Sequence, residues 1–185
     1  MAGWVILCRT RSEATQALRD AKEILESLGL TLHPEKTRIT HISKGFEFLG
    51  YKVKQGQGLR LPTHKIKKGP NKLNLYAIQT QKSVERFVGT IRNRTKRRVP
   101  LKLNELIQTI NPVMRGWGNY YRKAHVRKLF NKLQRWILRR IWSHRRKRWR
   151  NAGWKKYPVK MLYEVYRLEN LTSLIPDLNR KTASR

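Results

Sequence analysis

Three stretches of the chain carry apolar residues at the spacing of one face of an α-helix. Pro100 separates the first stretch from the second, and Asn111-Pro112 should break or kink the second, because proline lacks a backbone donor and disfavours helical geometry in the preceding residue. Three such stripes predict a small helical bundle in the later part of the chain. The stripes are Val84, Phe87, Val88 and Ile91; Leu103, Leu106, Ile107 and Ile110; and Val126, Leu129, Phe130, Leu133, Trp136, Ile137 and Ile141.

The first part of the chain begins with a short apolar run, Trp4–Cys8, that predicts a buried strand. Thr10 follows as a candidate N-cap, and Glu13 stands three residues later, where it would complete a capping box. Apolar residues at helical spacing then predict a helix over residues 11–28, with Gly29 as its C-terminal stop.

A small meander should follow this helix. The segment His33–Thr37 predicts a turn, and strands are predicted at Arg38–Ile42, Phe46–Lys54 and Leu59–Pro62. The apolar residues of the second strand would pack on helix 11–28. The expected fold class is α+β, with a small strand-helix-meander unit followed by a mostly α-helical bundle.

Residues 63–79 are basic and rich in turn-forming residues at their start, which predicts a linker. The expected domains are therefore residues 1–62 and residues 80–185.

Charge is distributed unevenly along the chain. The chain has 43 Lys and Arg against 11 Asp and Glu, a formal net charge of +32. Residues 1–54 hold nine basic and six acidic side chains, whereas residues 55–163 hold 30 basic side chains and two acidic ones, Glu85 and Glu105. A folded chain of this charge repels itself and favours a polyanion, most often nucleic acid, and the later part should bind it.

Several other classes are excluded by what the chain contains. Its apolar runs are far shorter than the ~20 residues that cross a bilayer, and its start does not resemble a signal peptide, so we expect no membrane partner. Cys8 is the single cysteine, and the five histidines have no zinc-ligand spacing. We therefore expect no disulfide, no metal and no cofactor, in a reducing, cytosolic setting.

Two motifs resemble one known family. His33-Pro-Glu-Lys-Thr37 followed by Phe46-Glu-Phe-Leu-Gly-Tyr51 resembles the end of the palm in group II intron reverse transcriptases. Asn111-Pro-Val-Met-Arg-Gly-Trp-Gly-Asn-Tyr-Tyr-Arg122 resembles the signature of their maturase domain, also called domain X, which forms the thumb. The likeness extends over about residues 4–178 and implies a palm remnant followed by a thumb bundle.

The sequence departs from this family where catalysis would take place. The family's Tyr-Ala-Asp-Asp tetrad precedes the strand that here includes Val5–Leu7, but this chain has Met1-Ala-Gly-Trp4 there. Two-metal polymerisation needs those carboxylates, and the upstream aspartates, the fingers and most of the palm are missing as well. The resemblance thus implies no catalytic residues and no polymerase activity.

The candidate RNA-binding residues are the cations of the later part of the chain, where arginine favours bidentate phosphate contacts. No carboxylate lies between Ile107 and Tyr163 to neutralise them. Lys36 of the palm motif is a further candidate for a phosphate contact. The alternative, that it is a solvated lysine in a turn, has equal weight. The set is Lys36, Arg92, Arg94, Lys96, Arg97, Arg98, Arg115, Arg122, Lys123, Arg127, Lys128, Lys132, Arg135, Arg139, Arg140, Arg145, Arg146, Lys147, Arg148 and Arg150.

Trp117, Tyr120 and Tyr121 allow two interpretations. They lie among Arg115, Arg122 and Lys123, so that they could stack on RNA bases, or they form part of the bundle core. Gly116 and Gly118 would allow a helix or an RNA backbone to approach closely.

The leading hypothesis is a non-catalytic, maturase-like protein that binds a structured group II intron-type RNA and assists its folding, splicing or ribozyme activity. We expect it in the cytoplasm of a bacterial type of cell, within a ribonucleoprotein that also contacts a DNA target. The alternative is one half of a split reverse transcriptase, whose partner is a second protein that supplies the missing palm. A general nucleic-acid-condensing protein is disfavoured, because the motifs are ordered.

Overall fold

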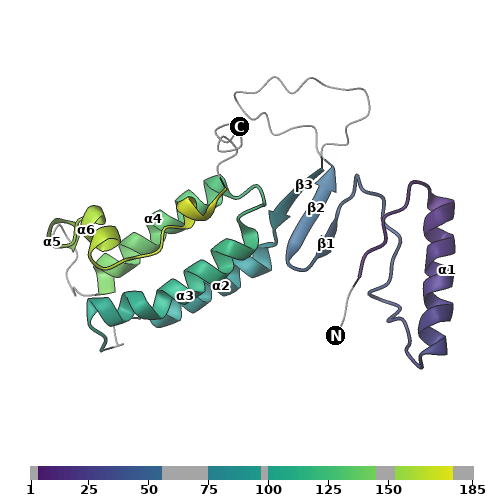
Figure 1. Ribbon diagram of the computed structural model, residues 1–185, viewed down its shortest axis with the longest axis horizontal. Helices are drawn as coiled ribbons and strands as arrows, with labels where there is room; N and C mark the ends of the chain where they lie inside the picture. Colours follow the sequence, from purple (N-terminus) through teal and green to yellow (C-terminus); the bar gives the residue numbers. More distant parts are fainter. Residues whose placement is uncertain (1–3, 56–74, 97–99, 145–152, 177–185) are drawn as a thin grey trace, which may run out of the picture. The chain divides into compact units, whose positions relative to one another are not determined.

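The computed structural model describes residues 4–55, 75–96, 100–144 and 153–176. The chain forms two compact units, Met1–Tyr76 and Ala77–Arg185. The fold class is α+β, as predicted from the sequence (Figure 1). Within the described residues, no helix is long and apolar enough to cross a membrane.

The first unit begins with helix α1, Arg11–Ser27. The Thr10 side chain accepts a hydrogen bond from the Glu13 backbone N–H, so the predicted N-cap is confirmed. Glu13 does not close the predicted capping box on Thr10, because its carboxylate accepts from the backbone N–H of Arg9, at 2.9 Å. At the other end, Gly29 has φ +71° and donates to Glu26, while Leu30 donates to Leu25, the bonding pattern of a Schellman motif.

Other predictions for the first unit are wrong. Trp4–Cys8 forms no strand, and its residues from Trp4 to Leu7 are exposed. Arg38–Ile42 also forms no strand, and none of residues 4–55, including those of α1, is buried. A short apolar run becomes a buried strand only where neighbouring elements pair with its edges and cover its faces, and residues 4–55 provide no such cover.

The predicted strand Phe46–Lys54 is a hairpin of two strands, β1 (Phe46–Phe48) and β2 (Tyr51–Gln55), which pair antiparallel with Phe48 opposite Tyr51. Leu49 and Gly50 form the turn with φ of +48° and +78°, and positive φ at both positions matches the twist of a hairpin. Leu-Gly is a weak turn signal because leucine disfavours this backbone region, which is why the sequence predicted one strand.

The strand β3 (Leu75–Gln79) follows β2 in a three-stranded sheet of order β1-β2-β3. These five residues are the end of the predicted linker, and the division between the two units falls within them. The predicted strand Leu59–Pro62 and the start of the linker lie outside the described residues.

The second unit contains the three predicted helices, α2 (Gln81–Arg94), α3 (Leu103–Tyr121) and α4 (Arg127–His144). The short helices α5 (Gly153–Lys156) and α6 (Val159–Glu164) follow, and then the 3-10 helix η1 (Leu171–Leu174). Helix α2 lies beside α3, and η1 packs against both α3 and α4 (Figure 1). The fully buried core side chains include Ile91, Leu106, Ile107, Ile110, Met114, Phe130, Ile137, Ile141, Leu162 and Leu171.

The sequence predicts a break or kink at Asn111-Pro112, but α3 continues through Pro112 without a break. Pro112 is exposed, and so is Gln108, whose carbonyl is the one that residue 112 would bond in a regular helix. Water can hydrate that carbonyl on the open face, while the buried residues on the opposite face hold the helix together.

Candidate nucleic-acid interface

A row of cations lies along one face of α4. The row consists of four exposed residues, spaced four, three and four positions apart: Lys128, Lys132, Arg135 and Arg139. At 100° per residue these positions share one side of the helix, opposite Phe130, Ile137 and Ile141. We call these four residues the α4 stripe; Arg127, also exposed, lies at its N-terminal end.

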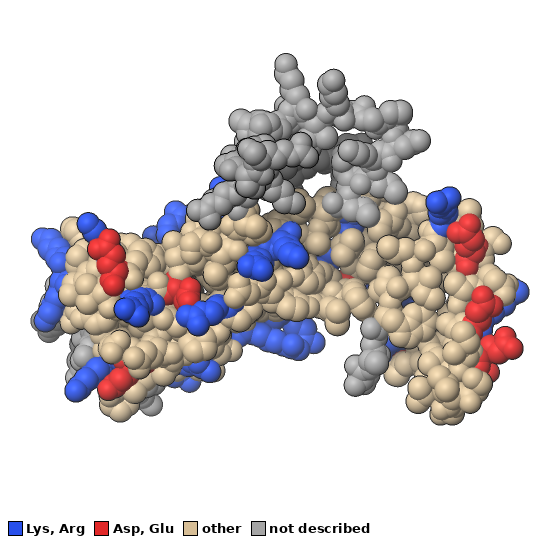
Figure 2. Space-filling model, in the orientation of Figure 1, with Lys and Arg blue, Asp and Glu red and all other residues tan. Residues whose placement is uncertain are grey.

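Acidic side chains are scarce in the second unit. The described part of that unit holds four, Glu85, Glu105, Glu164 and Glu169, and none of them belongs to α4. Figure 2 shows Lys and Arg distributed over the displayed face of the helical unit, whereas the acidic side chains of the first unit gather over α1. Neighbouring cations of the stripe repel one another without a nearby carboxylate, so this face favours a polyanion.

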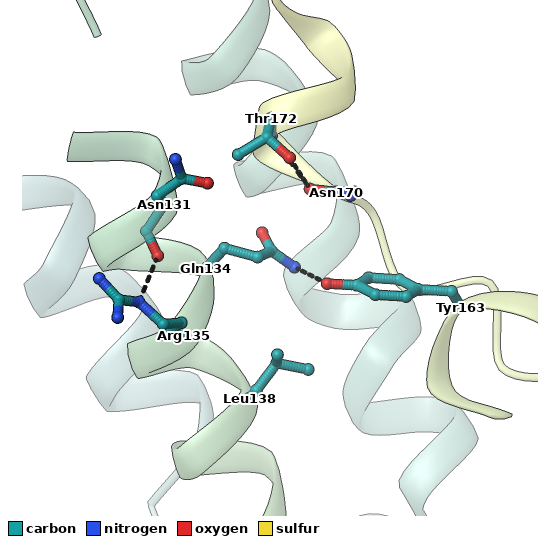
Figure 3. A pocket seen from close by; sticks show the side chains of 7 residues that line it. All are labelled: Asn131, Gln134, Arg135, Leu138, Tyr163, Asn170 and Thr172. Carbon is teal, nitrogen blue, oxygen red and sulfur yellow. Dashed lines mark hydrogen bonds between the residues drawn. The ribbon is translucent and has the colours of Figure 1, made fainter. Parts of the chain in front are cut away.

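Beside the stripe lies a pocket that sequence analysis missed (Figure 3). It has a volume of about 360 Å³ and lies between α4 and the segment that begins with α6. Arg135 belongs both to the stripe and to the pocket wall. The lining residues are Asn131, Gln134, Arg135, Leu138, Tyr163, Asn170 and Thr172.

Gln134 is buried next to this pocket and fixes its walls. Its amide donates to the Tyr163 hydroxyl, at 3.0 Å, and to the Glu169 carbonyl, at 3.1 Å, while its oxygen accepts from the Leu171 backbone N–H. Burial raises the pKa of the Tyr163 hydroxyl above its ordinary value, and the Gln134 hydrogen bond opposes that shift. The sequence signal for this site is an amide side chain within an apolar stripe, beside Leu133 and Ile137.

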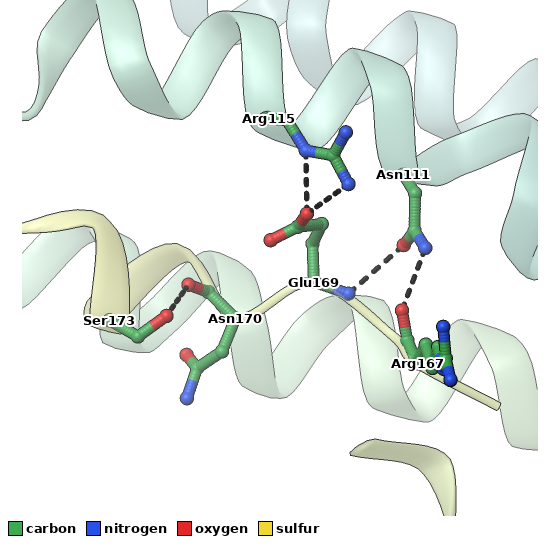
Figure 4. A network of polar contacts seen from close by, with 6 residues as sticks. All are labelled: Asn111, Arg115, Arg167, Glu169, Asn170 and Ser173. Atoms are coloured by element: carbon green, nitrogen blue, oxygen red, sulfur yellow. Dashed lines mark hydrogen bonds and ion pairs between the residues drawn. The ribbon is translucent and has the colours of Figure 1, made fainter. Parts of the chain in front are cut away.

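Arg115, predicted to bind RNA, forms an ion pair with a carboxylate of its own unit, Glu169 (Figure 4). Its Nε lies 2.7 Å from Glu169 Oε1. Asn111 holds the same segment, because its amide donates to the Arg167 carbonyl and its oxygen accepts from the Glu169 backbone N–H. Glu169 lies after the stretch between Ile107 and Tyr163 that contains no carboxylate. Counting charges along that stretch therefore could not reveal the ion pair between Arg115 and Glu169.

Arg140, also predicted to bind RNA, has a structural role at the end of α2. Its Nε donates to the Thr95 hydroxyl at 2.6 Å, and its NH2 group donates to the carbonyls of Thr95 and Arg92. These carbonyls lie at the C-terminal end of α2, where a cation satisfies the last acceptors and the helix dipole. The guanidinium also lies over the Trp136 ring, 5.6 Å from its centroid.

The aromatic residues of the predicted stacking site have different environments. Trp117 stacks on Phe87, with ring centroids 4.4 Å apart, and also contacts Phe130. Trp117 and Tyr121 both donate to the Ser83 hydroxyl, at 3.1 and 2.8 Å, and Tyr121 is 4% exposed. The structure therefore places these two rings in the bundle core, whereas Tyr120 is 48% exposed.

The other predicted RNA-binding cations that the structure describes are exposed. Arg92, Arg94 and Lys96 are exposed at and just beyond the end of α2, and Arg94 also donates to the Thr109 carbonyl. Arg122 and Lys123 are exposed after α3. Lys36 is exposed in the first unit, in the turn where the Lys36 backbone N–H donates to the His33 carbonyl. Arg97, Arg98, Arg145, Arg146, Lys147, Arg148 and Arg150 lie outside the described residues.

The helical unit also matches a known family. Residues 84–162 match the family described as the group II intron, maturase-specific domain. Over these residues the chain is similar to a group II intron maturase-specific domain. The resemblance of Asn111–Arg122 to the maturase signature is thereby confirmed. No curated protein matches the chain.

The match runs from α2 to α6 and includes the whole α4 stripe. It also includes Asn131, Gln134, Arg135 and Leu138 of the pocket, whereas Tyr163, Asn170 and Thr172 come from the segment beyond it. The pocket therefore forms where the matched region meets the segment that follows it in the sequence.

Proposed function

We propose that this chain is a non-catalytic RNA-binding protein, which holds a structured group II intron-type RNA and assists its folding, splicing or ribozyme activity. The α4 stripe is the observation that carries the proposal. It is a straight row of four exposed cations on a maturase-specific domain, and no acidic residue of α4 competes for them.

The mechanism is positioning. A row of cations on a rigid helix neutralises the phosphates along one RNA strand and so fixes the orientation of the protein on the RNA. Such contacts depend on backbone shape rather than sequence in paired RNA, because side chains cannot enter the deep and narrow major groove of an A-form helix. Arg92, Arg94, Arg122 and Lys123 are further exposed cations of the same unit that can extend the contact.

The experiment compares two variants that remove the same charge. In the first variant the four stripe residues are changed to Gln. In the matched control, four exposed cations of the first unit are changed to Gln: Arg19, Arg38, Lys44 and Lys52. Fluorescence anisotropy measures the affinity of each protein for a labelled, structured intron RNA between 50 and 200 mM salt.

We expect the stripe variant to lose affinity and to bind with a salt slope that is shallower by up to about 3.6, since each of four neutralised phosphates contributes roughly 0.7 to 0.9 to the slope. The control should keep the slope of the original protein. The free energy of unfolding of the stripe variant should stay equal or rise, because repulsion between neighbouring cations is relieved. Equal slopes for all three proteins would exclude the stripe from the interface.

A further inference from the structure

The pocket beside the α4 stripe has the polarity of a nucleotide site. Its lining residues include one cation, Arg135, and no carboxylate. The other lining groups are two asparagine amides, the Gln134 amide, two hydroxyls and one leucine. Its volume of about 360 Å³ lies within the usual range for small-molecule sites, roughly 300 to 1,000 Å³.

Several lining groups keep hydrogen-bonding capacity that the protein does not use. Among the described residues, the Asn131 side-chain amide and the Asn170 amide nitrogen make no hydrogen bond. Arg135 donates through its Nε to the backbone carbonyl of Asn131, and its two terminal nitrogens make no hydrogen bond to a described residue. The Tyr163 oxygen accepts from Gln134, which leaves the Tyr163 hydroxyl hydrogen to donate. The pocket thus offers donors together with the Asn131 amide oxygen as an acceptor.

The walls of the pocket are already fixed in place. Both ends of the Gln134 amide are bonded within the protein, and Asn170 caps η1 by accepting from the backbone N–H and the hydroxyl of Thr172. A ligand would therefore not have to order these groups, which lowers the free-energy cost of binding. In Figure 3 the side chains of Gln134 and Tyr163 point toward each other from α4 and from the segment that begins with α6.

We propose that this pocket receives one unpaired nucleotide of an RNA whose phosphates follow the α4 stripe. The inference rests on the proposed function and specifies part of the RNA that the maturase domain recognises. Arg135 connects the two sites, because a guanidinium at the rim can bind the phosphate on either side of the nucleotide. The free amides and the hydroxyl would then bond the base edge, which carries both donors and acceptors and is accessible only in unpaired RNA.

The test uses the full chain and labelled RNA hairpins of equal stem length. One hairpin is fully paired, and four others carry a single bulged A, C, G or U. At fixed salt, we expect at least one bulged hairpin to bind about tenfold more tightly than the paired hairpin, the effect of a few added hydrogen bonds. Equal affinity for all five hairpins would overturn the assignment of the pocket.

Two variants then locate the source of the preference. Asn131→Ala removes an exposed amide that no described residue bonds, and Tyr163→Phe removes one hydroxyl while Gln134 keeps its bond to the Glu169 carbonyl. Each should reduce the preference for the bulge at least threefold and leave the affinity for the paired hairpin unchanged. Asn119→Ala is the matched control, because Asn119 is an exposed asparagine on α3 that does not line the pocket.

A bulge preference that both variants retain would place the unpaired nucleotide elsewhere and overturn the proposal. Lys132→Gln should weaken binding of paired and bulged hairpins by the same factor, since Lys132 belongs to the stripe and not to the pocket. If no hairpin binds, the proposed function itself fails. A free nucleoside monophosphate at 1 mM (on the order of the weakest specific affinities) should weaken the bulge preference, because it carries the same base and phosphate as the unpaired nucleotide.

Discussion

A Cβ atom on Gly118 of α3 would lie 2.5 Å from Cδ1 of Leu174 in η1 and 3.1 Å from Cδ2 of Leu171. A side chain at residue 118 would therefore have to displace the end of the Leu174 side chain where η1 lies against α3. Leu171 is fully buried there, and the segment just before η1 supplies Glu169 and Asn170 to the site beside α4.

Gly118→Ala should destabilise the protein by roughly 1 to 3 kcal/mol, because the added methyl group overpacks this contact. Gly116→Ala is the matched control two residues away, where a Cβ would meet nothing within 4 Å. That change should stabilise the protein by up to about 1 kcal/mol, since alanine favours a helix. Urea unfolding followed by circular dichroism measures both, and a stabilised Gly118→Ala protein would show that η1 does not pack here.

Trp117→Ala should lower the free energy of unfolding by about 3 kcal/mol, because it removes a ring that stacks on Phe87 and leaves a cavity in the bundle. Tyr120→Ala, at an exposed position of the same helix, should change stability far less. The salt slope of RNA binding by the folded Trp117→Ala protein should stay unchanged. A stable Trp117→Ala protein that has lost RNA binding would instead assign Trp117 to base stacking.

Arg140 and Arg139 are neighbours in sequence with opposite expected roles. Arg140→Gln should destabilise the protein by roughly 1 to 3 kcal/mol, because the acceptors at Thr95 and Arg92 lose a charged donor. Arg139→Gln should leave stability unchanged and weaken RNA binding. Thermal unfolding together with RNA anisotropy separates the two effects, and the reverse pattern would exchange the two roles.

Residues 1–185 purified alone should not extend a primer on a template in the presence of magnesium and nucleotides. Two-metal polymerisation needs paired carboxylates, and this sequence has Ala2 and Gly3 where the resemblance would place aspartates. A radiolabelled primer-extension assay checks this, with an active reverse transcriptase as the positive control. Template-dependent extension by a preparation free of other polymerases would contradict the non-catalytic proposal.

The local signals of the sequence were sufficient for the helices. Apolar spacing predicted α2, α3 and α4, and Thr10 and Gly29 predicted the two ends of α1, because caps and periodicity act over only a few neighbouring residues. The same local reasoning failed at Trp4–Cys8, since a strand depends on partners distant in sequence. It also failed at the Leu49-Gly50 turn, where pairing of the flanking strands imposes a backbone that leucine disfavours.

The sequence by itself determined that the helical unit is strongly basic and contains a maturase signature, because charge and motif spacing are properties of the chain alone. Only the tertiary structure decided which cations remain free. Arg115 and Arg139 are both arginines on an exposed helix face, yet Arg115 pairs with Glu169, 54 residues away. The tertiary structure also formed the pocket, because Tyr163 and Asn170 meet α4 only after the chain has folded back along it. Contacts between residues so distant in sequence depend on how the helices pack, and no local pattern of the chain encodes them.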